Sequence, residues 1–188
     1  MIKERIQEVI CNFNMLLQDE WILNTIASAA DLIVTAIRSG NKLMICGNGG
    51  SAADAQHIAG EFLCRFYNDR APMPAIALTT DTSVLTSISN DYSFGEIFSR
   101  QVRGLGKEGD VLLSISTSGS SENVLQSFRA ASGLGIKTIL LSGATEREIA
   151  TISNIVIKTP SSDTPRIQEM HLIIEHILCE IVEKEING

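Results

Sequence analysis

The spacing of the hydrophobic positions changes at about residue 40. Before that point, apolar residues recur every three or four positions, as they do on one face of an α-helix. They form two runs, Ile2, Ile6, Val9, Ile10, Phe13, Leu16 and Leu17, and then Ile22, Ile26, Ala29, Ala30, Ile33, Val34 and Ile37. Ser39–Gly40 follows, and glycine commonly ends a helix. The pattern predicts a pair of helices over residues 2–39.

Beyond residue 40, short apolar runs without polar alternation are separated by helical patterns. Such runs are typical of strands buried on both faces, and their alternation with helices predicts a parallel sheet in an α/β fold. The predicted strands are Lys42–Cys46, Ala75–Leu78, Val111–Ile115, Thr138–Leu141 and Ile155–Ile157. The predicted helices are Ala52–Phe66, Phe94–Leu105, Glu122–Leu134, Glu146–Ile152 and Arg166–Lys184.

The chain shows no repeat, low-complexity tract or linker, so we predict one domain over residues 1–188. Residues 1–40 supply the helical pair, and residues 41–188 supply the α/β core. The apolar faces of the two helices need a partner, which is either a second copy of the chain or the domain's own sheet. We favour an oligomer interface.

The composition narrows the class of protein. The 188 residues are 44% hydrophobic and carry a net charge of −7, without a basic stripe, which argues against nucleic-acid binding. We read no secretory signal and no membrane span, and we expect a cytoplasmic protein. Cys11, Cys46, Cys64 and Cys179 lack CxxC pairing, so we expect reduced, mostly buried thiols.

Two loops after predicted strands have the composition of anion-binding loops. Gly47–Asn48–Gly49–Gly50–Ser51 leads into a helix, with Ser51 as the expected N-cap. Ser114–Ser121 offers many hydroxyl groups around Gly119 and again precedes a helix, with Ser121 as the expected cap. Each is also compatible with an ordinary strand-to-helix turn. Together they predict a phosphate site at the carboxyl ends of the strands, where α/β folds bind ligands.

Two helices carry groups that suit proton transfer or metal binding. His57 and Glu61 are four residues apart and therefore share a helix face. Gln168 and His176, two turns apart, can share a face of the last helix, whereas His171 is more often a structural residue at such a position. Imidazole and carboxylate groups suit Zn²⁺, and the same groups can act as general acid and base.

Four segments together resemble the phosphoheptose isomerases, a group of sugar-isomerase domains. The segments are CGNGGSAADAQHIAGEF (46–62), SNDYSFGEIFSRQV (89–102), GDVLLSISTSGSSENV (109–124) and RIQEMHLIIEHIL (166–178). The resemblance implies a three-layer α/β/α sandwich with a five-stranded parallel sheet, assembled as a homotetramer. It also implies isomerisation of the phosphorylated seven-carbon sugar D-sedoheptulose 7-phosphate to D-glycero-D-manno-heptose 7-phosphate. This is the first step toward nucleotide-activated heptose for lipopolysaccharide or capsule.

The resemblance also implies roles for single residues. Glu61 is the expected base and His176 the expected acid of an enediol mechanism. The expected ligands of one Zn²⁺ per subunit are His57, Glu61, Gln168 and His176. The expected substrate contacts are Asn48, Gly49, Gly50, Glu61, Asn90, Asp91, Ser116, Thr117, Ser118, Ser121 and Gln168.

A non-catalytic relative provides the alternative function. The segment Thr79–Thr82 is similar to that of tetrameric proteins of the same fold that bind the bacterial replication initiator. That relative lacks the positions of Glu61 and His176, and both residues are present here. A third class, the sugar-phosphate-binding regulators, carries a DNA-binding module for which 188 residues leave no room.

Overall fold

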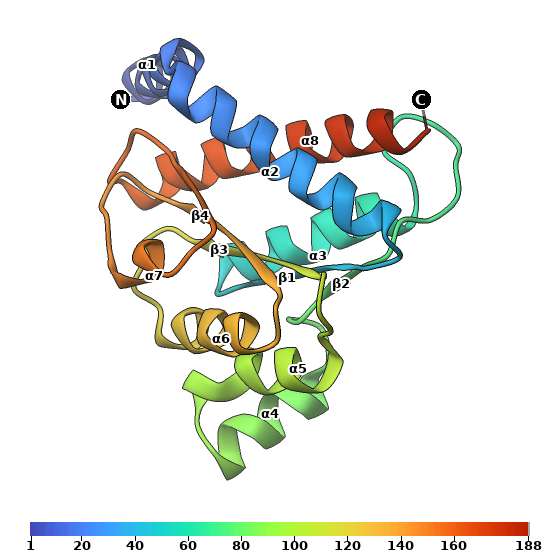
Figure 1. Cartoon of the computed structure of the whole chain (residues 1–188). Helices are drawn as coiled ribbons and strands as arrows, with labels where there is room; N and C mark the ends of the chain where they lie inside the picture. The colour runs from blue at the N-terminus through green and yellow to red at the C-terminus, as the bar shows by residue number, and fades with distance from the viewer. Residues whose placement is uncertain (188) are drawn as a thin grey trace.

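Strands that are apolar at nearly every position form the centre of the molecule. In the computed structural model, which describes residues 1–187, five strands make one sheet in the order β2-β1-β3-β4-β5 (Figure 1). All four neighbouring pairs are parallel. The strands are β1 (Leu43–Gly47), β2 (Ala75–Ala77), β3 (Val111–Ser116), β4 (Lys137–Ser142) and β5 (Ile155–Lys158). All five predicted strands are therefore confirmed, with each end within one residue.

The two faces of the sheet belong to two separate cores, because successive side chains of a strand point to opposite faces. In β1, Leu43 and Ile45 join one core, whereas Met44 and Cys46 join the other. A strand with both faces buried gains from an apolar residue at each position, which explains the unalternating runs in the sequence.

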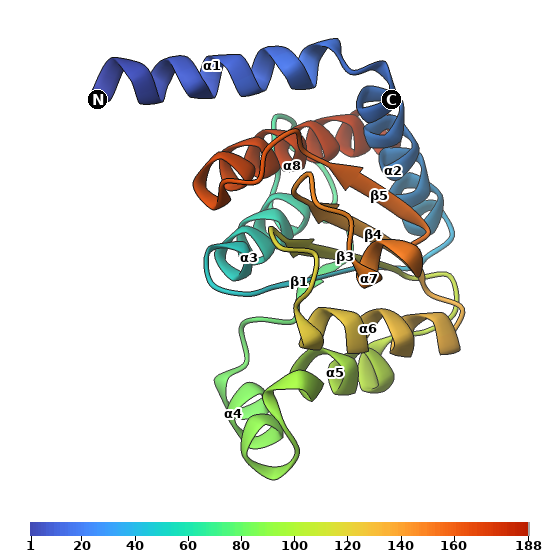
Figure 2. The ribbon, with the colours of Figure 1, turned by 90° about the vertical axis from the view of Figure 1, so that its left-hand side faces the viewer.

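Helices cover both faces, so the predicted three-layer α/β/α sandwich is confirmed (Figure 2). One layer comprises α2 (Glu20–Arg38), α3 (Gly50–Leu63) and α8 (Thr164–Asn187). The other comprises α4 (Thr82–Asp91), the 3-10 helix η1 (Phe94–Glu96), α5 (Ile97–Leu105), α6 (Glu122–Gly133) and α7 (Glu148–Thr151).

The two N-terminal helices take different places. Helix α2 buries Ile22, Ile26 and Ile33 in the core, as the alternative of packing on the domain's own sheet requires. By length and composition α2 could also span a membrane, but its apolar side is core. Helix α1 (Ile2–Gln18) projects away from the sandwich (Figure 2) and leaves Ile2 72% and Ile6 56% exposed. The oligomer interface therefore stays a prediction for α1.

Three local predictions need correction. Helix α4 was not predicted, because its Ser- and Thr-rich sequence lacks a clear apolar period; Asp81 caps it by accepting a hydrogen bond from the Val84 N–H at 3.0 Å. Helix α3 begins at Gly50, so Ser51 lies inside the helix and Gly49 takes the N-cap position. Only Cys46 and Cys179 are buried, whereas Cys11 and Cys64 are exposed; all four are free thiols.

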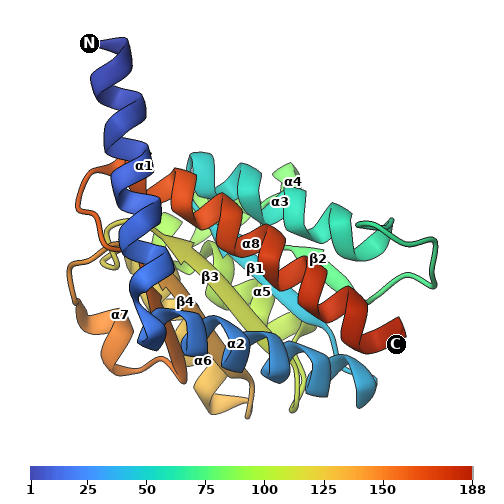
Figure 3. The same cartoon turned by 90° about the horizontal axis from the view of Figure 1, so that it is seen from above.

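The order of the strands creates a crevice at their carboxyl ends. The chain leaves β1 for α3 on one face of the sheet, and it leaves the neighbouring β3 for α6 on the opposite face. Loops that diverge from adjacent strands in this way mark a topological switch point, the usual ligand site of open α/β sheets. On the α3 side, α3 and α8 lie next to each other (Figure 3).

Candidate functional site

The glycine-rich segment at the end of β1 packs directly against neighbouring backbone atoms. A Cβ atom on Gly47 would lie 2.7 Å from the Ser51 carbonyl oxygen and 2.9 Å from that of Ile115, so no larger residue fits. Gly49 has φ +59°, a left-handed conformation that favours glycine. The loop therefore brings its peptide groups and the start of α3 close to the crevice, as an anion or a sugar hydroxyl requires.

Two amides fix the position of this loop. Asn48 Nδ2 donates to Asn123 Oδ1 at 2.9 Å, and Asn123 Nδ2 donates back to Asn48 Oδ1 at 2.8 Å. Asn123 is buried in the first turn of α6, so the pair ties the loop after β1 to the helix after β3. Sequence reasoning missed Asn123, because a lone asparagine at the start of a helix carries no signal of a partner 75 positions away.

The serine-rich loop after β3 closes on itself around Gly119, which has φ +61°. The Ser116 and Ser121 hydroxyl oxygens lie 3.3 Å apart, and Ser118 Oγ accepts a hydrogen bond from the Ser120 N–H at 3.3 Å. Ser121 occupies the N-cap position of α6 as predicted, but its hydroxyl makes no cap hydrogen bond. A hydroxyl turned away from its own helix leaves the first N–H groups of α6 available to an anion.

Arg147 lies beside the same loop and was also missed. A Cβ on Gly119 would lie 3.5 Å from Arg147 Cβ, and Arg147 lines one hollow with Thr117, Ser118 and Ser120. Its position, 26 residues after Ser121, follows only from the pairing of β3 with β4. A guanidinium here gives an acidic protein a local cation next to its predicted phosphate loop.

His57, Glu61 and His176 converge between α3 and α8. The Nε2 atoms of His57 and His176 lie 2.9 Å apart, and His57 Nε2 lies 3.6 Å from Glu61 Oε1. The His57 side chain is 45% exposed and that of Glu61 is 26% exposed, so a ligand can reach them. Helices α3 and α8 run side by side in the same direction, which places one imidazole from each helix at the same level.

Gln168 of α8 packs against the start of α3, the helix that carries His57 and Glu61. A Cβ on Gly50 would lie 2.8 Å from Gln168 Nε2, so the amide rests against the first residue of α3. A spacing of eight residues places Gln168 about two helical turns before His176 on α8. Within residues 1–187, no three His, Cys, Asp or Glu side chains are already arranged around a common metal position. The expected set of four zinc ligands, with Gln168 at the start of α3, stays a prediction.

Two ionisable side chains of α8 are buried beside the cluster. Among residues 1–187, no hydrogen-bond partner contacts the carboxyl oxygens of Glu175, and the buried His171 ring lies near the backbone of Ser142. Burial lowers the pKa of His171 to about 4, although the nearby Ser142 backbone favours the protonated form. Burial, followed by the charge of Asp54, raises the pKa of Glu175 to about 8. Both groups are therefore held mainly neutral, and His171 takes the buried, structural place expected for it.

Asn90 and Asp91 lie at the exposed end of α4. Asn90 Nδ2 donates to Asp91 Oδ1 at 2.8 Å, so their observed hydrogen bond is to each other. Helix α4 packs on the opposite side of the sheet from α3 and α8 (Figure 1). Their expected contact with substrate stays a prediction.

Residues 17–143 match the family of SIS domains. A phosphoheptose isomerase of Burkholderia pseudomallei (strain K96243) is 50% identical over 92% of this chain and 88% of its own length. That of Clostridium acetobutylicum is 49% identical over 100% of this chain and 95% of its own length.

Solved structures agree with this match. A phosphoheptose isomerase from Francisella tularensis superposes with a TM-score of 0.93 at 37% identity, covering 97% of this chain and 96% of that one. The corresponding structure from Neisseria gonorrhoeae gives a TM-score of 0.90 at 38% identity, covering 98% and 100%. The chain belongs to the phosphoheptose isomerase family of SIS-domain proteins.

Proposed function

We propose that this protein is an aldose–ketose isomerase that converts D-sedoheptulose 7-phosphate to D-glycero-D-manno-heptose 7-phosphate. The observation that carries the proposal is the convergence of Glu61 and His57, on the helix that follows the glycine-rich loop, with His176 of α8. The names of the relatives, at about half identity over nearly the whole chain, support the same reaction.

The two loops suggest how the substrate is held. The phosphate would lie at the start of α6, among the hydroxyls of Ser116, Thr117, Ser118 and Ser121. The sugar would extend along Asn48, Gly49 and Gly50 toward Gln168. Asn90 and Asp91 would complete the contacts. A phosphate fixed at one end leaves the carbonyl end of the open-chain sugar free to reach Glu61.

Isomerisation then needs one proton acceptor and one proton donor. Glu61 takes a proton from C1 of the ketose, the C1–H electrons form a C1=C2 double bond, and His176 gives a proton to O2. His176 then takes the proton from O1, the O1–H electrons form the C1=O double bond, and the C1=C2 electrons take the proton back from Glu61 at C2, so that an aldehyde remains at C1. Glu61 and His176 both end in their starting protonation states, so protons and electrons balance within the substrate and the two side chains.

The donor set fits Zn²⁺. Two imidazole nitrogens on a tetrahedral zinc are about 3.3 Å apart, so His57 and His176 at 2.9 Å need only a small ring movement to share one ion. Glu61 would be the third ligand, and Gln168 would have to approach from the glycine loop. A bound zinc would supply Lewis-acid polarisation of the substrate carbonyl. A carboxylate that contacts zinc is a weaker base, so Glu61 would combine both roles only with a loose metal contact.

Further expectations accompany the isomerase. We propose a cytoplasmic homotetramer with one zinc ion per subunit, and a product that serves nucleotide-activated heptose synthesis. The adaptor alternative rests on the resemblance of the Thr79–Thr82 segment. In the fold, Asp81 of this segment caps α4 and Thr79 Oγ1 donates to the Ala52 carbonyl at 3.2 Å. The names of the relatives favour the isomerase over the adaptor.

Turnover of sedoheptulose 7-phosphate by the purified, metal-analysed protein tests the proposal, with and without a chelator. We expect conversion to the aldoheptose phosphate, loss of activity on chelation, and recovery with zinc. No conversion by a folded, zinc-supplied oligomer would reject the reaction. Full activity in the metal-free protein would reject the proposed requirement for zinc.

A further inference from the structure

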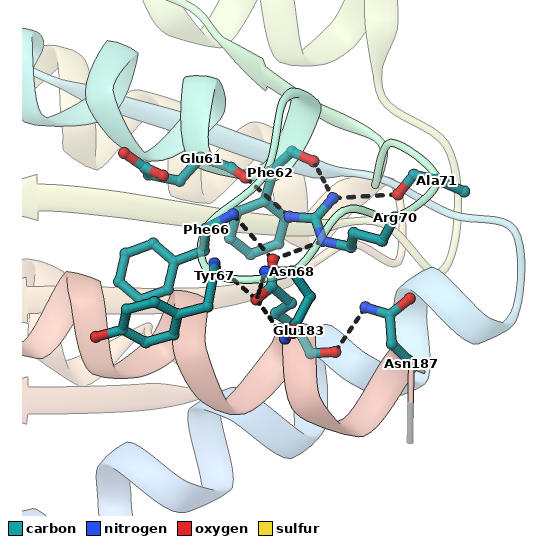
Figure 4. A network of polar contacts seen from close by, with 9 residues as sticks. All are labelled: Glu61, Phe62, Phe66, Tyr67, Asn68, Arg70, Ala71, Glu183 and Asn187. Atoms are coloured by element: carbon teal, nitrogen blue, oxygen red, sulfur yellow. Dashed lines mark hydrogen bonds and ion pairs between the residues drawn. The ribbon is translucent and has the colours of Figure 1, made fainter.

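A buried carboxylate near the end of α8 holds the segment that follows α3 (Figure 4). Glu183 is 1% exposed and accepts hydrogen bonds from three successive backbone N–H groups, those of Phe66, Tyr67 and Asn68, at 2.9, 2.9 and 3.0 Å. Arg70 Nε donates to it at 2.9 Å. Burial alone would raise the pKa of Glu183, but these donors outweigh burial and lower the pKa to about 2. The carboxylate is therefore charged at every pH at which the protein works.

Arg70 connects this carboxylate to the helix that carries Glu61. Its Nη2 donates to the backbone carbonyl of Glu61 at 2.9 Å, and its Nη1 donates to that of Phe62 at 2.9 Å (Figure 4). Both carbonyls belong to the last turn of α3, where helical partners are missing. A buried guanidinium thus fixes the backbone from which the Glu61 side chain extends.

The same carboxylate acts on His176 through an aromatic ring. Glu183 fixes the Phe66 backbone, and the Phe66 ring packs against the His176 ring with centroids 5.7 Å apart. On its other side Phe66 makes an edge contact with Tyr67, at 4.5 Å between centroids. Phe66 therefore restricts the rotation of the imidazole whose other neighbour is His57.

We propose that Arg70 and Glu183 are positioning residues that set the geometry between Glu61 and His176. Arg70 acts through the α3 backbone, and Glu183 acts through Phe66. The inference rests on the proposed function, because it assigns the network to the same site. Groups that hydrogen-bond a metal ligand directly typically change metal affinity or activity by about 10–100-fold when they are removed, and for these less direct partners we take the lower end of that range. Neither residue would touch the substrate.

The test compares Glu183→Gln and Arg70→Lys with the wild-type protein below their melting temperatures. Zinc affinity is measured by competition with a chelating dye, and kcat, KM and the pH profile of kcat are measured with sedoheptulose 7-phosphate. We expect zinc affinity and kcat to fall by about tenfold or more, with KM within about threefold, because the phosphate loop is untouched. The pH profile should shift, since the acid and the base lose their mutual placement.

A second buried carboxylate provides the control. Asp110 is fully buried, accepts from the Lys42 and Lys107 backbone N–H groups, and pairs with Lys42 Nζ at 2.6 Å. It precedes β3, at the end of the sheet away from the site. Asp110→Asn should lower Tm while leaving zinc affinity and the pH profile of the folded protein unchanged.

Phe66→Leu keeps the backbone hydrogen bonds to Glu183 and carries the test if Glu183→Gln does not fold. We expect it to reduce kcat and zinc affinity in the same direction, although Tm changes less than in Glu183→Gln. Wild-type zinc affinity, kcat and pH profile in the folded variants, with only Tm lowered, would overturn the proposal. If the wild-type protein fails to turn over the sugar, the proposed function fails, and the zinc affinities still decide the positioning role.

Discussion

The Nε2 atoms of His57 and His176 lie 2.9 Å apart although 119 positions separate the two residues in the chain. They meet because β1 and the loop before α8 start two helices at the same edge of the sheet, and these helices then run side by side. The relationship makes α3 and α8 one functional unit, with the acid and the base of the proposed reaction on different helices.

Glu61→Gln and His176→Gln should each abolish most turnover without unfolding the protein. General acid or base groups contribute about 10²–10⁴-fold, so we expect kcat to fall by at least about 100-fold. Steady-state kinetics with sedoheptulose 7-phosphate, alongside size-exclusion chromatography, makes the measurement. Glu180→Gln, an exposed carboxylate of α8, is the matched control and should keep its activity. Full activity in both site variants would reject their assigned roles.

Ser121→Ala should weaken substrate binding with little effect on stability. Its hydroxyl makes no cap hydrogen bond, so its removal costs the helix little, whereas a lost hydrogen bond to phosphate should raise KM by about tenfold or more. Asp81→Ala is the opposite case, because Asp81 does cap α4 and its loss should cost about 1 kcal/mol at unchanged KM. Kinetics and thermal unfolding of both variants separate the two effects. The prediction is wrong if Ser121→Ala leaves KM unchanged.

Gly50→Ala should displace Gln168 from the glycine loop. The new Cβ would lie 2.8 Å from Gln168 Nε2, and the flexible end of that side chain must move. We expect KM to rise roughly fivefold, equivalent to about 1 kcal/mol of binding, with Tm nearly constant. Gly133→Ala, where a Cβ meets nothing within 4 Å, serves as the control. Equal KM values in the two variants would exclude a substrate contact for Gln168.

His171 should make the folded state sensitive to mild acid. Its pKa of about 4 in the fold is below the usual 6.5, so the unfolded chain binds the proton first as pH falls. The free energy of unfolding is therefore unaffected by this group above pH 6.5. As pH falls from 6.5 toward 4, protonation of His171 in the unfolded chain lowers that free energy by about 3 kcal/mol in total. Denaturation of the wild type and of His171→Leu should therefore give a difference in unfolding free energy that favours the variant increasingly below pH 6.5. Parallel curves would contradict this assignment.

Helix α1 should carry an interface between copies of the chain. Ile6 and Ile10 are 56% and 46% exposed and share one face of a helix that projects from the sandwich. Ile6→Glu combined with Ile10→Glu should reduce the mass measured by light scattering while the core stays folded. Gln7→Glu, which adds a charge at another position of α1, should leave the mass unchanged. An unchanged mass in the double variant would exclude this face from the assembly.

The sequence by itself determined the layers of this protein. Short apolar runs such as Val111–Ile115, separated by helical periods, are typical of strands buried on both faces, and these periods place a helix after each strand. The spacing of His57 and Glu61 was enough to put both on one face of α3, and Gly49 indicated a turn that the backbone confirms. These features depend on local geometry, which the chain encodes within a few residues.

Only the tertiary structure decided which distant groups meet. The Asn48–Asn123 amide pair, Arg147 beside Gly119 and the hold of Glu183 on Phe66 all join segments whose proximity depends on strand order and helix packing. Gln168 is a further case, because its numbering gives two turns of helix to His176, whereas only the packing of α8 on α3 brings its amide to Gly50. A helical period in the sequence specifies only the direction in which a side chain leaves the backbone. A contact also depends on the position of a second helix or strand, and the packing of the whole core sets that position.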